Sequence, residues 1–331
     1  MDRKELLIHW LQFVLKNELF TITTASADAS FRRYFRVHLA DKTFIAMDAP
    51  PAQENCAPFV KLANLLISAG LNAPQIIAQD LQQGFLLLSD LGDITYLSVL
   101  NDTSAPHLYR DANQALIKMQ LASQTNVLPN YDEALLNREM QLFPDWYITQ
   151  HLQAKLNDQQ KVVLQNTFGV LTSNILSQGQ VYVHRDYHSR NLMVTSENSP
   201  GILDFQDAVY GAITYDLVSL LKDAYIAWQE EQVIDWLVRY WQDAREAGLP
   251  VPTDFSEFYR NFEWMGAQRH LKVLGIFARL YHRDGKDGYL KDMPLVMDYL
   301  RRVCGRYIEL RPMLKLLNSL EGHAEKAGYT F

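Results

Sequence analysis

Apolar residues recur at helical spacing within positions 1–20 of the chain. They are Leu6, Leu7, Trp10, Leu11, Val14 and Leu15. Residues three or four positions apart share one face of an α-helix, so this pattern predicts an amphipathic helix that docks on the next part of the chain. The segments 31–39 and 43–47 carry aromatic and β-branched residues and predict a strand pair that turns at 40–42. The segment 21–29 before them is small and polar.

A further strand and a series of helices are predicted for much of the remaining chain. A helix is expected at 59–68, and the apolar run 84–88 predicts a buried strand that ends in the polar turn 89–93. From Pro106 onward the apolar spacing is mainly helical. The expected helices span 109–121, 131–152 with an interruption at Pro144, 161–177, 217–221, 225–247, 255–281 and 294–317. This distribution predicts an α+β fold.

Three short apolar runs lie close together between residues 181 and 203. The runs 181–183, 192–194 and 201–203 each end where polar residues begin, which is typical of short strands. Residues 196–200 combine Ser, Glu, Asn and Pro, which favour a turn. The second and third runs are therefore predicted to form a hairpin.

Polar residues follow or precede these predicted strands in a specific order along the chain. An HRD sequence that ends at Asp186, then Asn191, then an Asp-Phe pair that begins at Asp204 together match the catalytic and metal loops of kinases. In phosphoryl transfer from ATP, one carboxylate orients and deprotonates the attacking hydroxyl group, while a carboxamide and a second carboxylate hold Mg²⁺. The pattern predicts a kinase. The alternative is a β-rich core whose surface happens to carry two Asp residues and one Asn.

The loop from Asp186 to Asn191 resembles the catalytic loop of the aminoglycoside phosphotransferase and choline kinase superfamily. His188 stands two residues after the Asp, as in these small-molecule kinases, where protein kinases usually have Lys. Other stretches resemble the bacterial kinases that phosphorylate the anomeric hydroxyl group of N-acetylmuramate and N-acetylglucosamine in peptidoglycan recycling. These stretches are 30–36, 47–51, 87–93, 143–147 and 202–220.

The resemblance implies a protein-kinase-like bilobal fold. A small mixed N-terminal lobe is expected at 1–88 and a larger, mainly helical C-terminal lobe at 94–331, joined by a hinge at 89–93. The N-terminal lobe is expected to bind the nucleotide, and the C-terminal lobe is expected to carry the catalytic loop and the acceptor pocket.

The same resemblance implies a role for each polar residue of the catalytic stretch. Asp186 is expected to orient the acceptor hydroxyl group and accept its proton, and His184 to hold the loop in shape. Asn191 and Asp204 are expected to bind Mg²⁺. Asp216 is expected either to cap the helix 217–221 or to brace the catalytic loop.

ATP is expected to bind through the N-terminal lobe and the hinge. The expected contacts are Ser30, Arg32, Arg33, Leu88, Asp90 and Leu91. The Gly-rich sequence of kinases is absent, but small residues in 25–30 would let backbone amides approach phosphate, and Arg32 and Arg33 would add donors. A plain hairpin with solvated arginines is the alternative.

Met47 departs from the kinase pattern, in which a Lys of the third strand contacts the phosphates and pairs with a helix Glu. Glu54, which opens the next helix, is expected to have lost that partner. Either Arg32, Arg33 or a nearby Lys supplies the missing charge, or catalysis relies on Mg²⁺ alone.

The acceptor pocket is expected, by resemblance, among the helices of the C-terminal lobe. Glu139, Asp145 and Trp146 are candidates for lining it, because a sugar needs an aromatic platform and hydrogen-bonding carboxylates. N-acetylmuramate also carries a lactyl carboxylate, for which Arg269, in a basic cluster with Lys272, is a candidate. Aromatic core packing and a solvated basic face are the alternatives.

Composition and charge narrow the class of protein. A net charge of −7 argues against a nonspecific nucleic-acid binder. Cys56 and Cys304 are far apart and form no disulfide framework or zinc motif, which fits a reducing cytoplasm. Polar residues within 1–20 interrupt any signal peptide, and no apolar run approaches the roughly 18 residues of a membrane span. We expect a cytoplasmic monomer whose partners are ATP and a small sugar.

Two alternatives differ in function. A kinase for an aminoglycoside, choline or a related metabolite would keep the fold and chemistry, and an acidic pocket without a basic residue near Asp186 would favour such a cationic acceptor. A catalytically inactive kinase-like binding module would explain the missing Lys at Met47. The retained Asp186, Asn191 and Asp204 argue against the inactive module.

Overall fold

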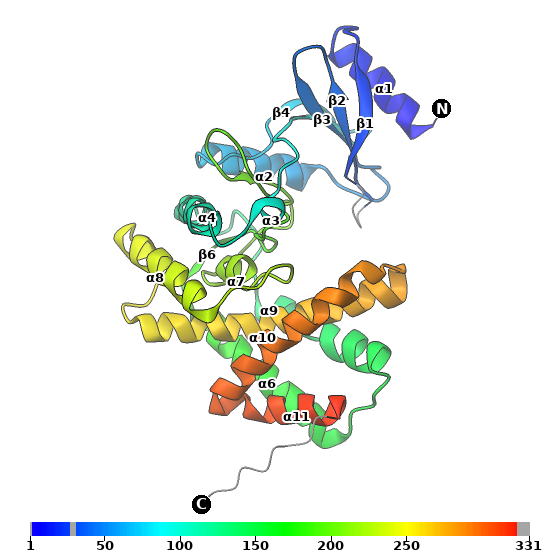
Figure 1. Cartoon of the computed structure of the whole chain (residues 1–331). Coiled ribbons are helices and arrows are strands. Elements are labelled where there is room, and N and C mark those ends of the chain that lie inside the picture. The colour runs from blue at the N-terminus through cyan, green and yellow to red at the C-terminus, as the bar shows by residue number, and fades with distance from the viewer. Residues whose placement is uncertain (1, 27–30, 323–331) are drawn as a thin grey trace, which may run out of the picture. The chain divides into compact units, whose positions relative to one another are not determined.

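The computed structural model describes residues 2–26 and 31–322. The chain divides into two compact units. Unit 1 comprises Met1–Met119 and Arg190–Ala208, and unit 2 comprises Gln120–Ser189 and Val209–Phe331. Unit 1 carries a small antiparallel sheet and unit 2 is mainly helical, which confirms the predicted α+β fold class (Figure 1). The predicted lobe boundaries stay a prediction.

The sheet of unit 1 has the strand order β1-β2-β3-β5-β4, with every neighbouring pair antiparallel. The strands are β1 (Thr21–Ser26), β2 (Arg33–His38), β3 (Thr43–Asp48), β4 (Ile76–Asp80) and β5 (Phe85–Ser89). The predicted pair β2–β3 and the buried strand β5 are confirmed. The sequence did not reveal β1, because the described side chains of this edge strand are mostly exposed and lack apolar alternation.

Helix α1 (Arg3–Val14) packs on one face of this sheet. Its fully buried Leu7 and Leu11 belong to a hydrophobic cluster with Phe35 of β2 and Ala46 of β3. Figure 1 shows the helix lying beside the strands. The predicted docking of the first amphipathic helix is confirmed.

A buried carboxylate at the end of β3 ties α1 to the sheet. Asp48 is fully buried and accepts hydrogen bonds from Nε of Arg3 at 2.9 Å and Nε of Arg33 at 3.0 Å. Successive residues of a strand point to opposite faces of the sheet. Tyr34 and Met47, which lie opposite each other in the β2–β3 register, therefore point away from α1.

The rest of unit 1 contains helices and a short hairpin. The helices are α2 (Ala57–Ser68), α3 (Tyr96–Val99) and α4 (Ala105–Leu121). Strands β7 (Leu192–Met193) and β8 (Gly201–Ile202) pair antiparallel, which confirms the predicted hairpin.

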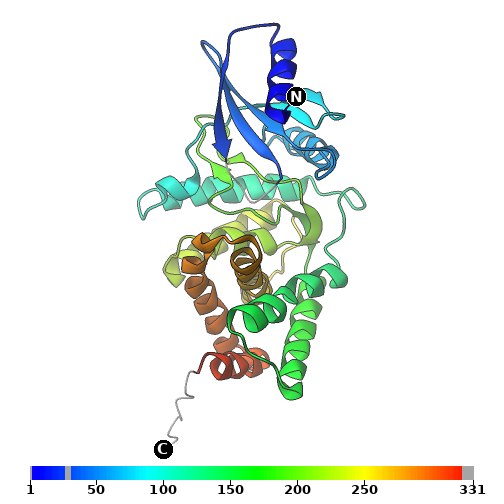
Figure 2. The same ribbon diagram turned by 90° about the vertical axis from the view of Figure 1, so that its right-hand side faces the viewer.

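Unit 2 is built around the long helix α9 (Phe255–Asp284), against which α10 (Met293–Arg306) packs (Figure 2). Its other helical segments are α5 (Glu133–Met140), the π-helix η1 (Phe143–His151), α6 (Asp158–Ser177), α7 (Tyr215–Leu221), α8 (Glu230–Glu246), η2 (Asp287–Asp292), α10 (Met293–Arg306), η3 (Ile308–Leu310) and α11 (Arg311–Glu321). Strands β6 (Gln180–Val183) and β9 (Val209–Ala212) pair antiparallel. Over the described ranges, none of the helices combines the length and apolarity needed to cross a membrane.

The last predicted helix, 294–317, is wrong in its extent. Helix α10 ends at Arg306, a 3₁₀ turn follows, and α11 begins at Arg311. Pro312 lies in the first turn of α11, where its missing N–H group costs no helical hydrogen bond, whereas inside a continuous helix it would break one. The helix predicted at 225–247 likewise begins later, at Glu230.

Two glycines of unit 2 are expected to respond in opposite ways to alanine. A Cβ atom on Gly275 of α9 would lie 2.4 Å from the carbonyl carbon of Leu142, whereas one on Gly169 of α6 would meet nothing within 4 Å. We expect Gly275→Ala to destabilise the protein by about 1–3 kcal/mol through overpacking. Gly169→Ala should stabilise it by about 0.5–1 kcal/mol. Denaturant unfolding of both variants measures the difference, and equal stabilities would contradict the described packing of α9.

Candidate active site

The loop that carries Asp186 lies in unit 2 and is held at both ends by buried carboxylates. The N–H groups of His184 and Arg185 donate to Asp216 at 2.7 and 3.0 Å. At the other end, the N–H group and the hydroxyl group of Ser189 donate to Asp223 at 3.0 and 2.5 Å. Of the two roles expected for Asp216, its contacts favour bracing of the loop.

The side chain of His184 contacts two residues of the same loop, Asp186 and Tyr187. Its Nδ1 atom accepts a hydrogen bond from the N–H group of Asp186 at 3.3 Å, and its ring meets Tyr187 edge-on at 5.7 Å. Arg185 has a positive φ of 77°, a conformation that few residues other than glycine adopt. The two braces and this turn fix the backbone from which the Asp186 side chain projects.

Positive groups surround the Asp186 carboxyl group within unit 2. Burial raises the pKa of Asp186, but the opposing charges of Lys272, His188, Arg269 and His184 outweigh it and lower that pKa below its ordinary value. The carboxylate is therefore ionised at neutral pH, as a proton acceptor must be. Burial also raises the pKa of the neighbouring Asp216 to about 7.

Glu139 of α5 lies at the centre of a buried charge network. It accepts hydrogen bonds from the hydroxyl group of Tyr131 and from Arg185, and it lies 3.0 Å from the ammonium group of Lys272. Burial raises the pKa of Glu139, but Lys272 and Arg185 outweigh it and lower the pKa. Nη2 of Arg269, one turn before Lys272 on α9, donates to Ser219 at 2.7 Å. The candidate acceptor residues Glu139 and Arg269 thus lie close to the catalytic loop.

The other two candidate acceptor residues lie on the π-helix η1. Asp145 is exposed and accepts a hydrogen bond from Gln141 at 2.9 Å, and Trp146 is half-buried. A π-helix is rare and is frequently found at functional sites, so η1 is consistent with a functional role for this segment. The contact of either side chain with an acceptor stays a prediction.

The proposed metal ligands lie together in unit 1, at one end of the β7–β8 hairpin. Asn191 immediately precedes β7, and its carbonyl group accepts a hydrogen bond from Leu203, just past β8, at 2.9 Å. The side-chain amide of Asn191 lies 3.4 Å from Asp204, and Gln206 donates to the same carboxylate at 2.8 Å. The hairpin thus brings together two residues that are separated by thirteen positions in the sequence.

The Asn191–Asp204 pair suits a hard divalent cation. Asp204 is exposed and has a positive φ of 60°, which directs the carboxylate away from a regular strand path. Mg²⁺ prefers oxygen ligands and is usually held by one or two carboxylates together with substrate phosphates. The accessible Asp204 carboxylate meets that requirement, and Asn191 would add an oxygen ligand by turning Oδ1 toward the ion in place of its Nδ2 group, which lies 3.4 Å from Asp204.

The two arginines expected to contact ATP have different partners within unit 1. Arg33 is tied to the buried Asp48. Nη2 of Arg32 instead lies 2.9 Å from Oε2 of Glu54, the residue expected to have lost its usual Lys partner, and the two side chains are only 13% and 19% exposed. Ser30, the third predicted contact in this region, lies outside the described residues.

The three ATP contacts predicted in and next to the hinge, Leu88, Asp90 and Leu91, have structural contacts of their own. Leu88 is buried in β5. Asp90 accepts a hydrogen bond from Nε of Arg36 at 2.7 Å. A Cβ atom on Gly201 would come 3.0 Å from the Leu91 side chain, so that side chain packs against β8. Their contact with a nucleotide stays a prediction.

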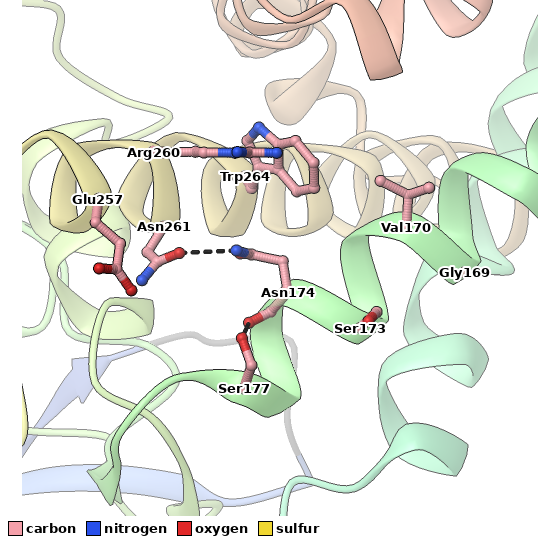
Figure 3. Close-up of a pocket in the computed structure, with 9 residues that line it drawn as sticks. All are labelled: Gly169, Val170, Ser173, Asn174, Ser177, Glu257, Arg260, Asn261 and Trp264. Carbon is pink, nitrogen blue, oxygen red and sulfur yellow. Dashed lines mark hydrogen bonds between the residues drawn. The ribbon is translucent and has the colours of Figure 1, made fainter. Parts of the chain in front are cut away.

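A separate pocket of about 650 Å³ lies between α6 and α9 of unit 2 (Figure 3). Its lining residues are Gly169, Val170, Ser173, Asn174, Ser177, Glu257, Arg260, Asn261 and Trp264. At this pocket, Nδ2 of Asn174 on α6 donates a hydrogen bond of 2.7 Å to Oδ1 of Asn261 on α9. The lining contains none of the predicted catalytic, metal or acceptor residues, so volume alone does not identify the reaction site in this protein.

Sequence reasoning missed several residues that support the candidate site. Asp223 and Tyr131 received no role, because nothing in their sequence neighbourhood indicates that they contact the loop 184–189 or Glu139. A usable signal was present in α9, where Arg269 and Lys272 stand at helical spacing, and the structure buries both. Buried cations require nearby anions, which points to a charge network.

Comparisons with known proteins agree with this geometry. The family model described as "Phosphotransferase enzyme family" matches residues 21–252. The N-acetylmuramate/N-acetylglucosamine kinase of Neisseria meningitidis serogroup B is 48% identical over 337 residues, which cover 100% of both chains. The protein of the same name from Pseudomonas aeruginosa is 52% identical over 301 residues, or 91% of this chain and 89% of that protein.

The fold is also shared with a solved structure. The crystal structure of a choline kinase from Streptococcus pneumoniae superposes with a TM-score of 0.65 at 13% identity, and the match covers 90% of this chain and 98% of that one. This likeness and the sequence matches confirm the resemblance that the catalytic-loop residues indicated. The chain belongs to the phosphotransferase enzyme family.

Proposed function

We propose that the protein is an ATP-dependent kinase that phosphorylates the anomeric hydroxyl group of N-acetylmuramate and N-acetylglucosamine in peptidoglycan recycling. The observation that carries this proposal is the 48% identity, over the full length of both chains, to a kinase named for these two sugars. The ionised Asp186 and the paired oxygen ligands Asn191 and Asp204 support it. We expect the enzyme to act in the cytoplasm, where ATP is available, as a monomer.

In the proposed mechanism Asp186 orients the acceptor hydroxyl group and accepts its proton. His184 holds the loop in shape through its hydrogen bond with the Asp186 backbone. The cations around Asp186 make it a weak base, and an anomeric hydroxyl group is more acidic than an ordinary alcohol. A weak base is therefore sufficient to accept the proton of this acidic hydroxyl group. Positioning of the reactants supplies much of the rate.

Asn191 and Asp204 are the proposed ligands of Mg²⁺. An ion held there would supply the positive charge that offsets the negative charge developing on the phosphates of ATP. Asp204 supplies the negative charge for the metal, Asn191 supplies a neutral oxygen, and Gln206 orients the Asp204 carboxylate through a hydrogen bond of 2.8 Å.

For the nucleotide, we propose that Arg32 takes the place of the strand Lys that Met47 replaces. Its guanidinium group is paired with Glu54, as the strand Lys is paired with a helix Glu in protein kinases. Arg33, by contrast, is committed to Asp48 on the face that carries α1. Ser30, Leu88, Asp90 and Leu91 remain proposed contacts of ATP.

Arg32→Gln is expected to weaken nucleotide binding about 10- to 100-fold. A hydrogen bond to a charged group contributes about 1.5–3 kcal/mol, and each 1.4 kcal/mol corresponds to a factor of ten in affinity. The KM for ATP and the Kd for ADP, measured by calorimetry, should rise together. Arg33→Gln should change them less; equal effects in the two variants would contradict the assignment to Arg32.

Glu139, Asp145, Trp146 and Arg269 are the proposed acceptor residues. Arg269 is buried, and its Nε atom has no hydrogen-bond partner among the described residues. A buried, unsatisfied donor is costly, so an anionic group of the acceptor would stabilise it. The lactyl carboxylate of N-acetylmuramate is such a group. The positive charge around Asp186 also argues against a cationic acceptor.

ATP consumption with Mg²⁺ and each of four acceptors tests this proposal. The acceptors are N-acetylmuramate, N-acetylglucosamine, choline and kanamycin. Turnover with the two amino sugars is expected, with a lower KM for N-acetylmuramate if Arg269 binds its carboxylate; equal KM values would contradict that role. Turnover only with choline or kanamycin would keep the fold and mechanism but reject the substrate. Nucleotide binding without turnover would favour an inactive binding module.

A further inference from the structure

Lys272 is buried in the middle of α9, although Lys is rarely found in a protein interior. Its ammonium group donates a hydrogen bond of 2.9 Å to the hydroxyl group of Tyr215 and lies 3.0 Å from Glu139. Two partners on two other elements therefore fix the position of the charge. Burying a charge is costly unless it is paired in this way.

Glu139 connects this ammonium group to the catalytic loop. One of its carboxylate oxygens, Oε1, receives both Lys272 and Arg185, and the other, Oε2, receives Tyr131. Arg185 is the chain neighbour of Asp186, and its backbone N–H group is held by Asp216. The position of Lys272 is thereby coupled to the loop that presents Asp186.

We propose that Lys272 is a positioning residue of the transfer reaction: held by Glu139 and Tyr215, its ammonium group fixes the charge environment of the Asp186 carboxylate beside the Glu139–Arg185 pair of the catalytic loop. This inference rests on the proposed role of Asp186 as proton acceptor. It also assigns Glu139 a task besides the proposed contact with the acceptor, namely to hold Lys272 and Arg185 in place.

The charges that act on Asp186 come from three parts of unit 2. Lys272 and Arg269 belong to α9, His184 and His188 to the loop itself, and Asp216 to α7. Among the groups that lower the pKa of Asp186, Lys272 has the largest effect. Because the cation favours the charged carboxylate, its removal must raise that pKa, and a larger fraction of Asp186 would be protonated at a given pH.

A second buried lysine provides a matched control. Lys222 lies 3.3 Å from the buried Glu263, which is also paired with Arg306, as Glu139 is also paired with Arg185. The side chain of Lys272 is 9% exposed and that of Lys222 is 12% exposed. Burial lowers the pKa of Lys222, whereas Tyr215, Glu139 and Asp186 raise that of Lys272 against the effect of burial. Of the two lysines, only Lys272 is therefore coupled to Asp186.

The experiment follows the protonation of Asp186 directly in Lys272→Met and Lys222→Met. In protein labelled with ¹³C at the Asp carboxyl carbons, the Asp186 signal is assigned from its absence in Asp186→Asn. We expect the titration midpoint of Asp186 to rise by about one pH unit in Lys272→Met, since an adjacent cation lowers a carboxyl pKa by about 1–3 units. The midpoint should stay unchanged in Lys222→Met and recover in Lys272→Arg.

Kinetics provide the second measurement. The acid limb of the kcat–pH profile should move to higher pH in Lys272→Met by the same amount, with the KM for ATP unchanged. An unshifted Asp186 midpoint in Lys272→Met, or equal shifts in the two Met variants, would overturn the inference. The NMR titration does not require turnover. If the wild-type protein does not phosphorylate the amino sugars, the proposed function is rejected, but the effect of Lys272 on Asp186 is still decided by the titration.

Discussion

Asp186→Asn is expected to lower kcat about 10²- to 10⁴-fold, the usual contribution of a positioned general base. The carboxamide has the same shape as the carboxylate but cannot accept the proton of the acceptor hydroxyl group. The loop should keep its conformation, because its braces to Asp216 and Asp223 come from backbone and Ser189 groups. ATP consumption at saturating acceptor measures the loss.

The control for this variant is Asp158→Asn. The Asp158 side chain is 98% exposed at the start of α6, and its salt bridge with Lys161 is on the surface. The Asp158→Asn variant should therefore have the kcat of the wild type. Calorimetric binding of ADP should be unchanged in Asp186→Asn. A kcat within a factor of ten of the wild type would show that Asp186 is not the proton acceptor.

Asp204→Asn is expected to lower kcat about 100-fold or more and to raise the Mg²⁺ concentration needed for half-maximal activity. A catalytic metal contributes several kcal/mol to transition-state stabilisation, and each 1.36 kcal/mol is a factor of ten in rate. Asn tolerates the positive φ of 60° at this position and can keep the hydrogen bond from Gln206, so the hairpin should remain folded. The rate as a function of Mg²⁺ concentration measures both effects.

Glu197→Gln serves as the control for Asp204→Asn. Glu197 is an exposed carboxylate between the strands of the same hairpin, so this change removes an equal charge from the same segment. Its Mg²⁺ dependence should match the wild type. If the two variants respond alike, the effect at Asp204 reflects general electrostatics and not ligation of the metal.

The parts of the fold that the sequence predicted well are those with strong local patterns. Helix α1 follows from the spacing of Leu7 and Leu11, and the β7–β8 hairpin follows from two apolar runs around a turn. Strand β1 was missed because it lies at a sheet edge, where exposed positions carry no apolar alternation. The break between α10 and α11 was missed because the helical spacing continues across Pro312 and conceals the stop signal.

The candidate site shows a similar division. The order and spacing of Asp186, Asn191 and Asp204 along the chain were enough to predict the chemistry. The groups that tune and brace these residues come from distant positions: Asp223 follows α7, and Lys272 lies on α9. Such contacts depend on the tertiary fold: the basic residues of α9 are visible in the sequence, but their partners are not.

The proposed reaction places the phosphate on the anomeric hydroxyl group of the sugar. The most direct test is ³¹P NMR of the product formed from ATP and N-acetylglucosamine or N-acetylmuramate, beside the methyl glycoside of N-acetylglucosamine, whose anomeric oxygen is blocked. We predict a phosphate coupled to the anomeric proton with both free sugars and no product from the glycoside. Phosphorylation of the glycoside, or a phosphate on another carbon, would contradict the account.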